Sequence, residues 1–224
     1  MGQKEKYQAG EELATAYISI PVSGKGPGVI VLHAWWGLNN FFMQLCDQLS
    51  QEGFVALAPD LYHGKVAVTI DEAKELRSKV ERKVANTEMI GAVDYLKSHR
   101  AVVSPKVSVI GFSLGANFAN WLALNKPEDI HSVVLFYGKG GGKFEKTDVK
   151  YLGHFAERDR YGAGPEKVEV FKERLLEAGR EVTFYTYRDT EHWFFEEDRP
   201  EAFNPQAAKL AWERTIEYLR KQYP

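Results

Sequence analysis

The chain has 224 residues, of which 44% are hydrophobic and 27% charged, and its formal net charge at pH 7 is −2. These values are ordinary for a folded globular protein, and basic and acidic residues are spread along the chain. We therefore expect neither nucleic acid nor a membrane as a partner. The sequence has no apolar run close to the ~18 residues of a transmembrane helix, which favours a single cytoplasmic domain over residues 1–224.

Cys46 is the one cysteine of the chain, so it cannot form an internal disulfide, as suits a reducing compartment. Its neighbours Leu45 and Leu49 continue a helical apolar pattern, and we interpret Cys46 as a small core residue. The first residues, MGQKEKYQAGEE, lack the apolar segment of a secretion signal. Both observations agree with a cytoplasmic protein.

Short apolar runs alternate along the chain with segments of helical period. The runs typical of strands cover residues 13–21, 29–32, 54–58, 107–110, 132–137, 149–156 and 181–187. The segments typical of helices cover residues 41–51, 116–124, 165–178 and 205–222. Two more helices are expected before the fourth strand, one beginning with a capping box from Thr69 to Glu72 and one with Met89, Val93 and Leu96 on one face. The glycine run 138–142 is expected to form a flexible loop over the sheet edge.

This alternation predicts an α/β fold, with a mostly parallel sheet of about seven or eight strands and helices on both faces. The strand at 13–21 alternates apolar and polar residues and is expected near a sheet edge. Ligands of such sheets bind at the carboxyl ends of the strands. The residues directly after each strand are therefore the candidates for a functional site.

The stretch 106–117, KVSVIGFSLGAN, contains G-x-S-x-G at the junction of an apolar run and a helix. Such a spacing forces a sharp, strained turn that exposes the hydroxyl of Ser113 above the sheet. Gly111 and Gly115 are expected because Cβ atoms there would collide with the neighbouring strand and helix. The backbone N–H of Leu114, at the start of the helix, is then free to bind a negative oxygen.

A serine hydroxyl needs a neutral imidazole to take its proton, and that imidazole needs a carboxylate to orient it. In this kind of fold the three follow in the order serine, acid, histidine. Among the six histidines, we choose His192 as the base because it follows the last strand. Asp159, in the loop after the preceding strand, is the preferred acid. Carboxylates that remain open for this role are Glu157, Asp189 and Glu191.

The first buried strand is followed by His33-Ala34-Trp35-Trp36-Gly37. A loop at this place can supply a second oxyanion donor, which we assign to the Trp35 backbone N–H. We expect the His33 side chain to hold the loop by hydrogen bonds rather than to act as a base. Two adjacent indoles do not easily enter one core together, so at least one of them is expected to line a pocket.

With these residues identified, the chain resembles the dienelactone hydrolase family of α/β-hydrolases over nearly its whole length. The stretches that carry the resemblance are VIVLHAWWGLN, GFVALAPDLYHG, VSVIGFSLGA, LFYG, GHFAERD and EHWFFEEDRPEAFNPQAAKLAWERT. The resemblance implies the α/β-hydrolase fold and hydrolysis of a small ester, without cofactor or metal. It assigns Ser113, Asp159 and His192 to a catalytic triad, Trp35 and Leu114 to the oxyanion hole, and Trp36, Tyr137, Tyr161 and Trp193 to the substrate pocket.

The chain departs from the family pattern at three positions. Ser113 stands where prototype members have a cysteine, and Ala34 where they have a glutamate after the loop histidine or glutamine. Glu196 stands where they have an arginine that helps to hold the substrate carboxylate. A negative charge at that position would repel an anionic lactone, so the departures favour neutral esters, with lactones a further possibility.

Two other classes of function remain open. The same triad could serve a thioesterase, a peptidase or a perhydrolase, and the fold could also persist as a binding module without catalysis. A dehalogenase is disfavoured, because that chemistry uses an aspartate where this chain has Ser113.

Overall fold

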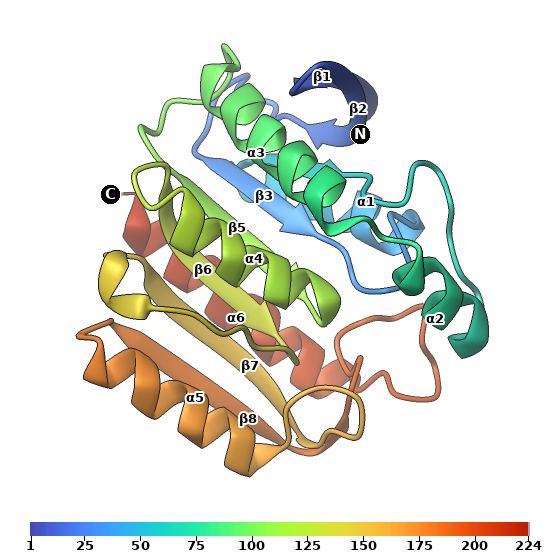
Figure 1. The fold of residues 1–224 in the computed structure, drawn as a ribbon, viewed down its shortest axis with the longest axis vertical. Coiled ribbons are helices and arrows are strands. Elements are labelled where there is room, and N and C mark those ends of the chain that lie inside the picture. The colour runs from blue at the N-terminus through green and yellow to red at the C-terminus, as the bar shows by residue number, and fades with distance from the viewer. Residues whose placement is uncertain (224) are drawn as a thin grey trace. The chain divides into compact units, whose positions relative to one another are not determined.

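The computed structural model describes residues 1–223 and, within them, eight strands and six α-helices (Figure 1). The strands are β1 (Gln3–Ala9), β2 (Glu12–Ser19), β3 (Gly28–Leu32), β4 (Val55–Pro59), β5 (Val107–Phe112), β6 (Ile130–Phe136), β7 (Lys150–Arg158) and β8 (Val182–Glu191). The helices are α1 (Asn40–Gln51), α2 (Ile70–Ser78), α3 (Arg82–Ser98), α4 (Leu114–Asn125), α5 (Pro165–Glu177) and α6 (Pro205–Gln222).

These strands hydrogen-bond in the order β1-β2-β4-β3-β5-β6-β7-β8. The pairs β3–β4, β6–β7 and β7–β8 are parallel, whereas β2 is antiparallel to both of its neighbours, β1 and β4. The predicted α/β fold with a mostly parallel sheet is therefore confirmed. The chain divides into two compact units, Met1–Val109 and the part that begins at Ile110, and β5 contributes residues to both.

In the first unit, β3 and β4 are buried along their whole length, as their unbroken apolar runs predict. Helix α3 packs on one face of this part of the sheet and α1 on the other (Figure 1). Cys46 lies on the buried side of α1 with no exposed surface, which confirms it as a core residue. Helix α2 begins with the predicted capping box between Thr69 and Glu72.

The second unit contains the end of β5 and the strands β6 to β8. Helices α4 and α5 lie on one face of these strands and α6 lies on the other (Figure 1). His154, in the middle of β7, is fully buried and bonds the Tyr187 hydroxyl through Nδ1 (2.8 Å) and the Thr215 hydroxyl through Nε2 (3.0 Å). Burial lowers the pKa of this histidine to about 3, helped by the nearby Arg214 charge. His154 is thus a neutral structural residue, as its place within a strand predicts.

The register between β7 and β8 is irregular near their carboxyl ends. Ala156 pairs with Tyr187, and the next pair is Arg158 with Glu191, so β8 uses two more residues than β7 over this interval. Asp189 absorbs the excess in a left-handed conformation with φ 55°, as is typical of a β-bulge. The first residues beyond the two strands consequently lie next to each other.

Apart from shifts of one or two residues at their ends, the strands differ in two respects from those expected from the sequence. The edge strand β1 was not predicted, because it is polar apart from the buried Tyr7 and Ala9. Charged residues are usual on such an edge, since they discourage pairing with other chains. Strand β8 continues to Glu191 rather than ending at Tyr187, because the bulge lets the chain rejoin the ladder.

The glycine run 138–142 is packed more closely than a free loop. A Cβ atom on Gly140 would overlap the side chain of Asn120, whose amide donates a hydrogen bond to the Gly141 carbonyl (3.2 Å).

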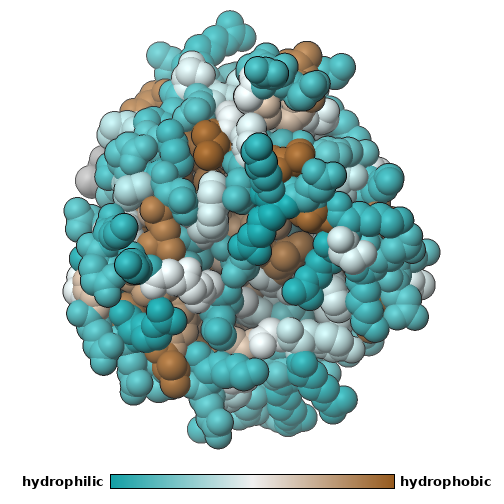
Figure 2. All heavy atoms as spheres, viewed as in Figure 1, coloured by the Kyte–Doolittle hydropathy of each residue, from teal (hydrophilic) through white to brown (hydrophobic). Residues whose placement is uncertain are grey.

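On the face seen in Figure 2 the surface is mostly hydrophilic, with apolar residues in separate spots. No helix within residues 1–223 combines the length and the apolar character that crossing a membrane requires.

The capping box of α2 offers a test of local stability. The Thr69 hydroxyl accepts from the Glu72 N–H (3.3 Å), and the Glu72 carboxylate accepts from the Thr69 N–H (3.0 Å). We expect Thr69→Ala to lower the free energy of unfolding by about 1 kcal/mol, measured by urea denaturation. Thr69→Ser keeps the hydroxyl and should stay close to wild type; equal losses in both variants would contradict this role of the hydroxyl.

Candidate active site

Ser113 lies at the turn between β5 and α4, with φ 51° and ψ −106°. This is a left-handed conformation that costs free energy in a residue with a side chain. The Ser113 N–H donates to the Phe136 carbonyl (2.9 Å), which ties the turn to the end of β6. A Cβ atom on Gly111 would overlap the Gly115 carbonyl, so the glycine is required for the predicted steric reason.

His192 is the first residue after β8, and its ring is 2% exposed. Its Nε2 lies 2.8 Å from the Ser113 hydroxyl, and its Nδ1 lies 2.9 Å from each carboxylate oxygen of Asp159. The structure thus brings together the three residues chosen from the sequence. With Nδ1 protonated and held by the carboxylate, Nε2 presents a lone pair to the hydroxyl.

Asp159 follows β7 directly, and its carboxylate is buried. Besides His192, Oδ1 accepts hydrogen bonds from the N–H groups of Tyr161 (2.9 Å) and Gly162 (2.6 Å). Burial on its own would raise the pKa of this carboxyl, but His192 and the two backbone donors outweigh it, and the pKa falls below its usual value. Asp159 is therefore a carboxylate near neutral pH.

The other carboxylates considered for the acid have different partners. Glu157 accepts a hydrogen bond from the Asp189 N–H (3.0 Å), and Asp189 pairs with Arg158. Both contacts support the bulge of β8. Glu191 is exposed on the last residue of that strand. Among the candidates, the hydrogen bonds of the His192 ring go to Asp159.

Aromatic rings surround the imidazole of His192. The ring of Tyr137 meets it nearly edge to face at 4.9 Å between centroids, the ring of Trp193 at 5.0 Å, and the ring of Tyr161 at 6.0 Å. Tyr137 and Trp193 also have left-handed backbones, with φ 37° and 69°. Strained residues of this kind concentrate at functional sites, and here they flank the imidazole.

The residues predicted to line the substrate pocket differ in exposure. Trp36, Tyr137 and Trp193 are buried, while Tyr161 is 52% exposed. Their assignment to the pocket stays a prediction, and so does the oxyanion role of the Trp35 and Leu114 N–H groups. Leu114 is the first residue of α4, and the first N–H groups of a helix have no partner within it.

The loop 33–37 lies in the first unit and is held by its own contacts. The Nδ1 of His33 donates to the Ala34 carbonyl (2.7 Å), which confirms that His33 hydrogen-bonds within this loop. Burial lowers the pKa of His33. The indoles of Trp35 and Trp36 pack edge to face at 5.6 Å, and both are buried.

Two glycines at the site were missed by the sequence analysis. A Cβ atom on Gly162 would lie 2.5 Å from the Tyr137 carbonyl oxygen, 2.6 Å from Asp159 Oδ2 and 2.8 Å from His192 Cε1. One on Gly138 would lie 2.5 Å from the Ser113 carbonyl oxygen. The available signal was their position, since each closely follows a predicted strand or the predicted acid.

Glu196 has no exposed surface and accepts a hydrogen bond from the Tyr137 hydroxyl through Oε1 (2.5 Å), while its Oε2 has no hydrogen-bond partner. Burial raises the pKa of Glu196 to about 8, against the lowering effect of the Tyr137 bond. The carboxyl is therefore mostly protonated at pH 7. Burial therefore disfavours the negative charge expected at this position, and the repulsion of anionic lactones stays a prediction.

Comparisons with known proteins give the family and the fold that the chain shares with its relatives. The model of the dienelactone hydrolase family matches residues 14–223. Protein usf of Aquifex pyrophilus is 33% identical, and the match covers 99% of this chain and 99% of the relative. A carboxymethylenebutenolidase of Pseudomonas sp. is 28% identical over 93% of this chain and 90% of its own. The solved structure of a dienelactone hydrolase-like promiscuous phosphotriesterase from metagenomic libraries has a TM-score of 0.87 at 18% identity, covering 100% of this chain and 99% of that chain, which shows a shared fold.

Gly162 provides a test of the site geometry. We expect Gly162→Ala to displace His192 or Asp159 and to slow the reaction of Ser113 with a fluorophosphonate probe by about 10²-fold, because small misplacements of reacting groups have effects of this order. Gly164→Ala is the matched control, since its nearest neighbour would lie 4.0 Å from the new Cβ. Equal labelling rates in the two variants, with both folded, would show that the close approach at Gly162 is unimportant.

The protonated state of Glu196 predicts a pH dependence of stability. Its folded pKa of about 8 exceeds the ordinary glutamate pKa of 4.5, so its contribution is fully present below pH ~4.5 and is lost as pH rises through ~8. Glu196→Gln does not titrate. We expect it to gain on the order of 3 kcal/mol of unfolding free energy relative to wild type between pH 5 and pH 8, measured by denaturant unfolding. Glu197→Gln, at an exposed neighbour, should show no such change, and a flat difference for Glu196→Gln would mean that the carboxyl is already ionised at pH 5.

Proposed function

The chain belongs to the dienelactone hydrolase family, and on this premise we propose that it is a serine hydrolase of small carboxylic esters, lactones included. The observation that carries the proposal is the contact of 2.8 Å between the Ser113 hydroxyl and His192 Nε2, with the Nδ1 of the same ring held by Asp159. A carboxylic ester hydrolase is the activity to which the family and its named relatives point.

In the proposed mechanism, the Ser113 oxygen attacks the ester carbonyl while His192 Nε2 takes its proton. Asp159 holds the ring and stabilises the imidazolium that forms. The oxyanion is stabilised by backbone N–H groups, for which Leu114 and Trp35 are the predicted donors. The imidazolium then gives its proton to the leaving alcohol, and water, activated by the same histidine, cleaves the acyl-enzyme.

Several observations support Ser113 as a working nucleophile. Its strained backbone conformation, the buried imidazole and the ionised Asp159 are the features that activation of a serine requires. A module used only for binding has no need of them. They do not distinguish an oxygen ester from a thioester, because both are attacked at the same carbonyl.

The preference for neutral esters rests on the charge of the site. Position 196 holds a buried glutamate, so it provides no cation to hold a substrate carboxylate. A neutral ester needs no cation at this position, whereas the carboxylate of an anionic lactone has no partner there. We therefore place small neutral esters first and anionic lactones second.

Hydrolysis of p-nitrophenyl esters from acetate to decanoate tests the proposal. We expect activity on the short chains, and a loss of kcat of ~10⁴-fold or more in Ser113→Ala and in His192→Ala. Asp159→Asn should cost on the order of 10²–10⁴-fold, because it favours the wrong tautomer of the ring.

Parallel rates on the ester, thioester and amide of one acyl group would identify the preferred bond. Near wild-type activity in any of the three variants would remove that residue from the mechanism. If no ester is hydrolysed and Ser113 is not labelled by a fluorophosphonate, the binding-module interpretation replaces the proposal.

A further inference from the structure

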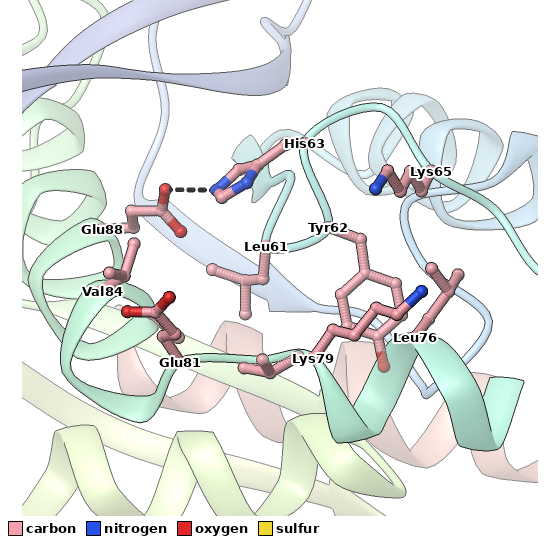
Figure 3. A pocket seen from close by; sticks show the side chains of 11 residues that line it. Leu61, Tyr62, His63, Lys65, Leu76, Lys79, Glu81, Val84 and Glu88 are labelled. Atoms are coloured by element: carbon pink, nitrogen blue, oxygen red, sulfur yellow. Dashed lines mark hydrogen bonds and ion pairs between the residues drawn. The ribbon is translucent and has the colours of Figure 1, made fainter.

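The first unit contains a cavity of about 190 Å³ between the loop 61–65 and the helices α2 and α3 (Figure 3). We call it the α2–α3 cavity. This volume is roughly that of six water molecules in the liquid, enough for a short chain of heavy atoms but not for a drug-sized ligand. The residues proposed above for ester hydrolysis do not line it.

The wall formed by the loop is preorganised. The Asp60 carboxylate accepts hydrogen bonds from the N–H groups of Tyr62 (3.2 Å) and Gly64 (2.7 Å). Between them, His63 has a left-handed backbone with φ 53°, and its Nε2 lies 2.7 Å from Glu88 Oε1. A strained residue that is not glycine persists only where its surroundings hold it, and here it presents the imidazole to α3.

The charges around the cavity are separated by sign. In Figure 3 the carboxylates of Glu81 and Glu88 lie on one side, and the ammonium groups of Lys65 and Lys79 lie on the other. Lys79 also pairs with Glu75 on the exposed surface of α2. The positive charge of Arg77 opposes the rise that burial causes in the pKa of Tyr62.

Apolar side chains complete the lining, among them Leu61, Leu76, Val80 and Val84, and in Figure 3 Leu61 lies between the glutamates and the lysine ammonium groups. A simple amine would meet the lysines at one end, and a simple carboxylate would meet the glutamates at the other. A molecule with an ammonium group, a methylene chain and a carboxylate satisfies both ends and the middle. We propose that the α2–α3 cavity binds a short linear ω-amino acid, with its ammonium group toward Glu81 and Glu88 and its carboxylate toward Lys65 and Lys79.

Isothermal titration calorimetry on the full chain tests this proposal with 4-aminobutanoate, 6-aminohexanoate and 8-aminooctanoate as probes. Hexylamine and hexanoate are the controls with one charge. We expect saturable binding with a dissociation constant on the order of 1 mM, an optimum chain length among the amino acids, and at least roughly tenfold weaker binding of both controls. Absence of saturation for all three amino acids, or equal binding of hexylamine or hexanoate, would overturn the proposal and leave a cavity filled by water.

Variants locate the binding within the cavity. Lys79→Met should weaken binding about tenfold, whereas Lys74→Met should leave it unchanged. Lys74 is the matched control, because it lies on α2, directly after which Lys79 follows, forms a similar ion pair and has a side chain that is 60% exposed, as is that of Lys79. Equal effects of the two variants would place the binding elsewhere.

Discussion

The left-handed backbone of Ser113 is the constraint on which the second unit depends. A residue with a side chain resists this conformation, so the turn is kept only because its surroundings hold it. The N–H bond to Phe136 fixes its position, and the absence of side chains at Gly111 and Gly138 makes room for it. As a result, the Ser113 hydroxyl projects toward the imidazole of His192 and lies 2.8 Å from its Nε2.

The imidazole itself is positioned by more than its hydrogen bonds. Its two nitrogens are engaged by Ser113 and Asp159, and the edges of the Tyr137 and Trp193 rings limit its remaining freedom. The hydroxyl of Tyr137 is in turn held by the buried carboxyl of Glu196. An uncharged partner suits this place, because an unpaired negative charge there would be costly to bury and would favour the imidazolium over the neutral base.

Local patterns were sufficient to predict the order of the elements from β2 to α6 and the three side chains, Ser113, Asp159 and His192, that meet in the folded chain. Apolar runs mark the buried strands, and the G-x-S-x-G spacing marks the turn, because both follow from short-range geometry. The polar edge strand β1 has no such signal, since its partner β2 defines it. The charge of Glu196 depends on its burial by segments that are distant in the sequence. The importance of Gly162 depends on two loops that meet only in the folded chain.

The bulge in β8 makes a length, rather than a composition, decisive for the second unit. From Ala156 to Arg158 strand β7 advances two positions while β8 advances four, from Tyr187 to Glu191, and the histidine follows immediately. Losing the two extra residues would leave a more regular ladder but would draw the imidazole back along the strand, away from the serine. The identities of the bulge residues can therefore drift far more readily than their number, and insertions or deletions between positions 187 and 192 are the changes this fold tolerates least.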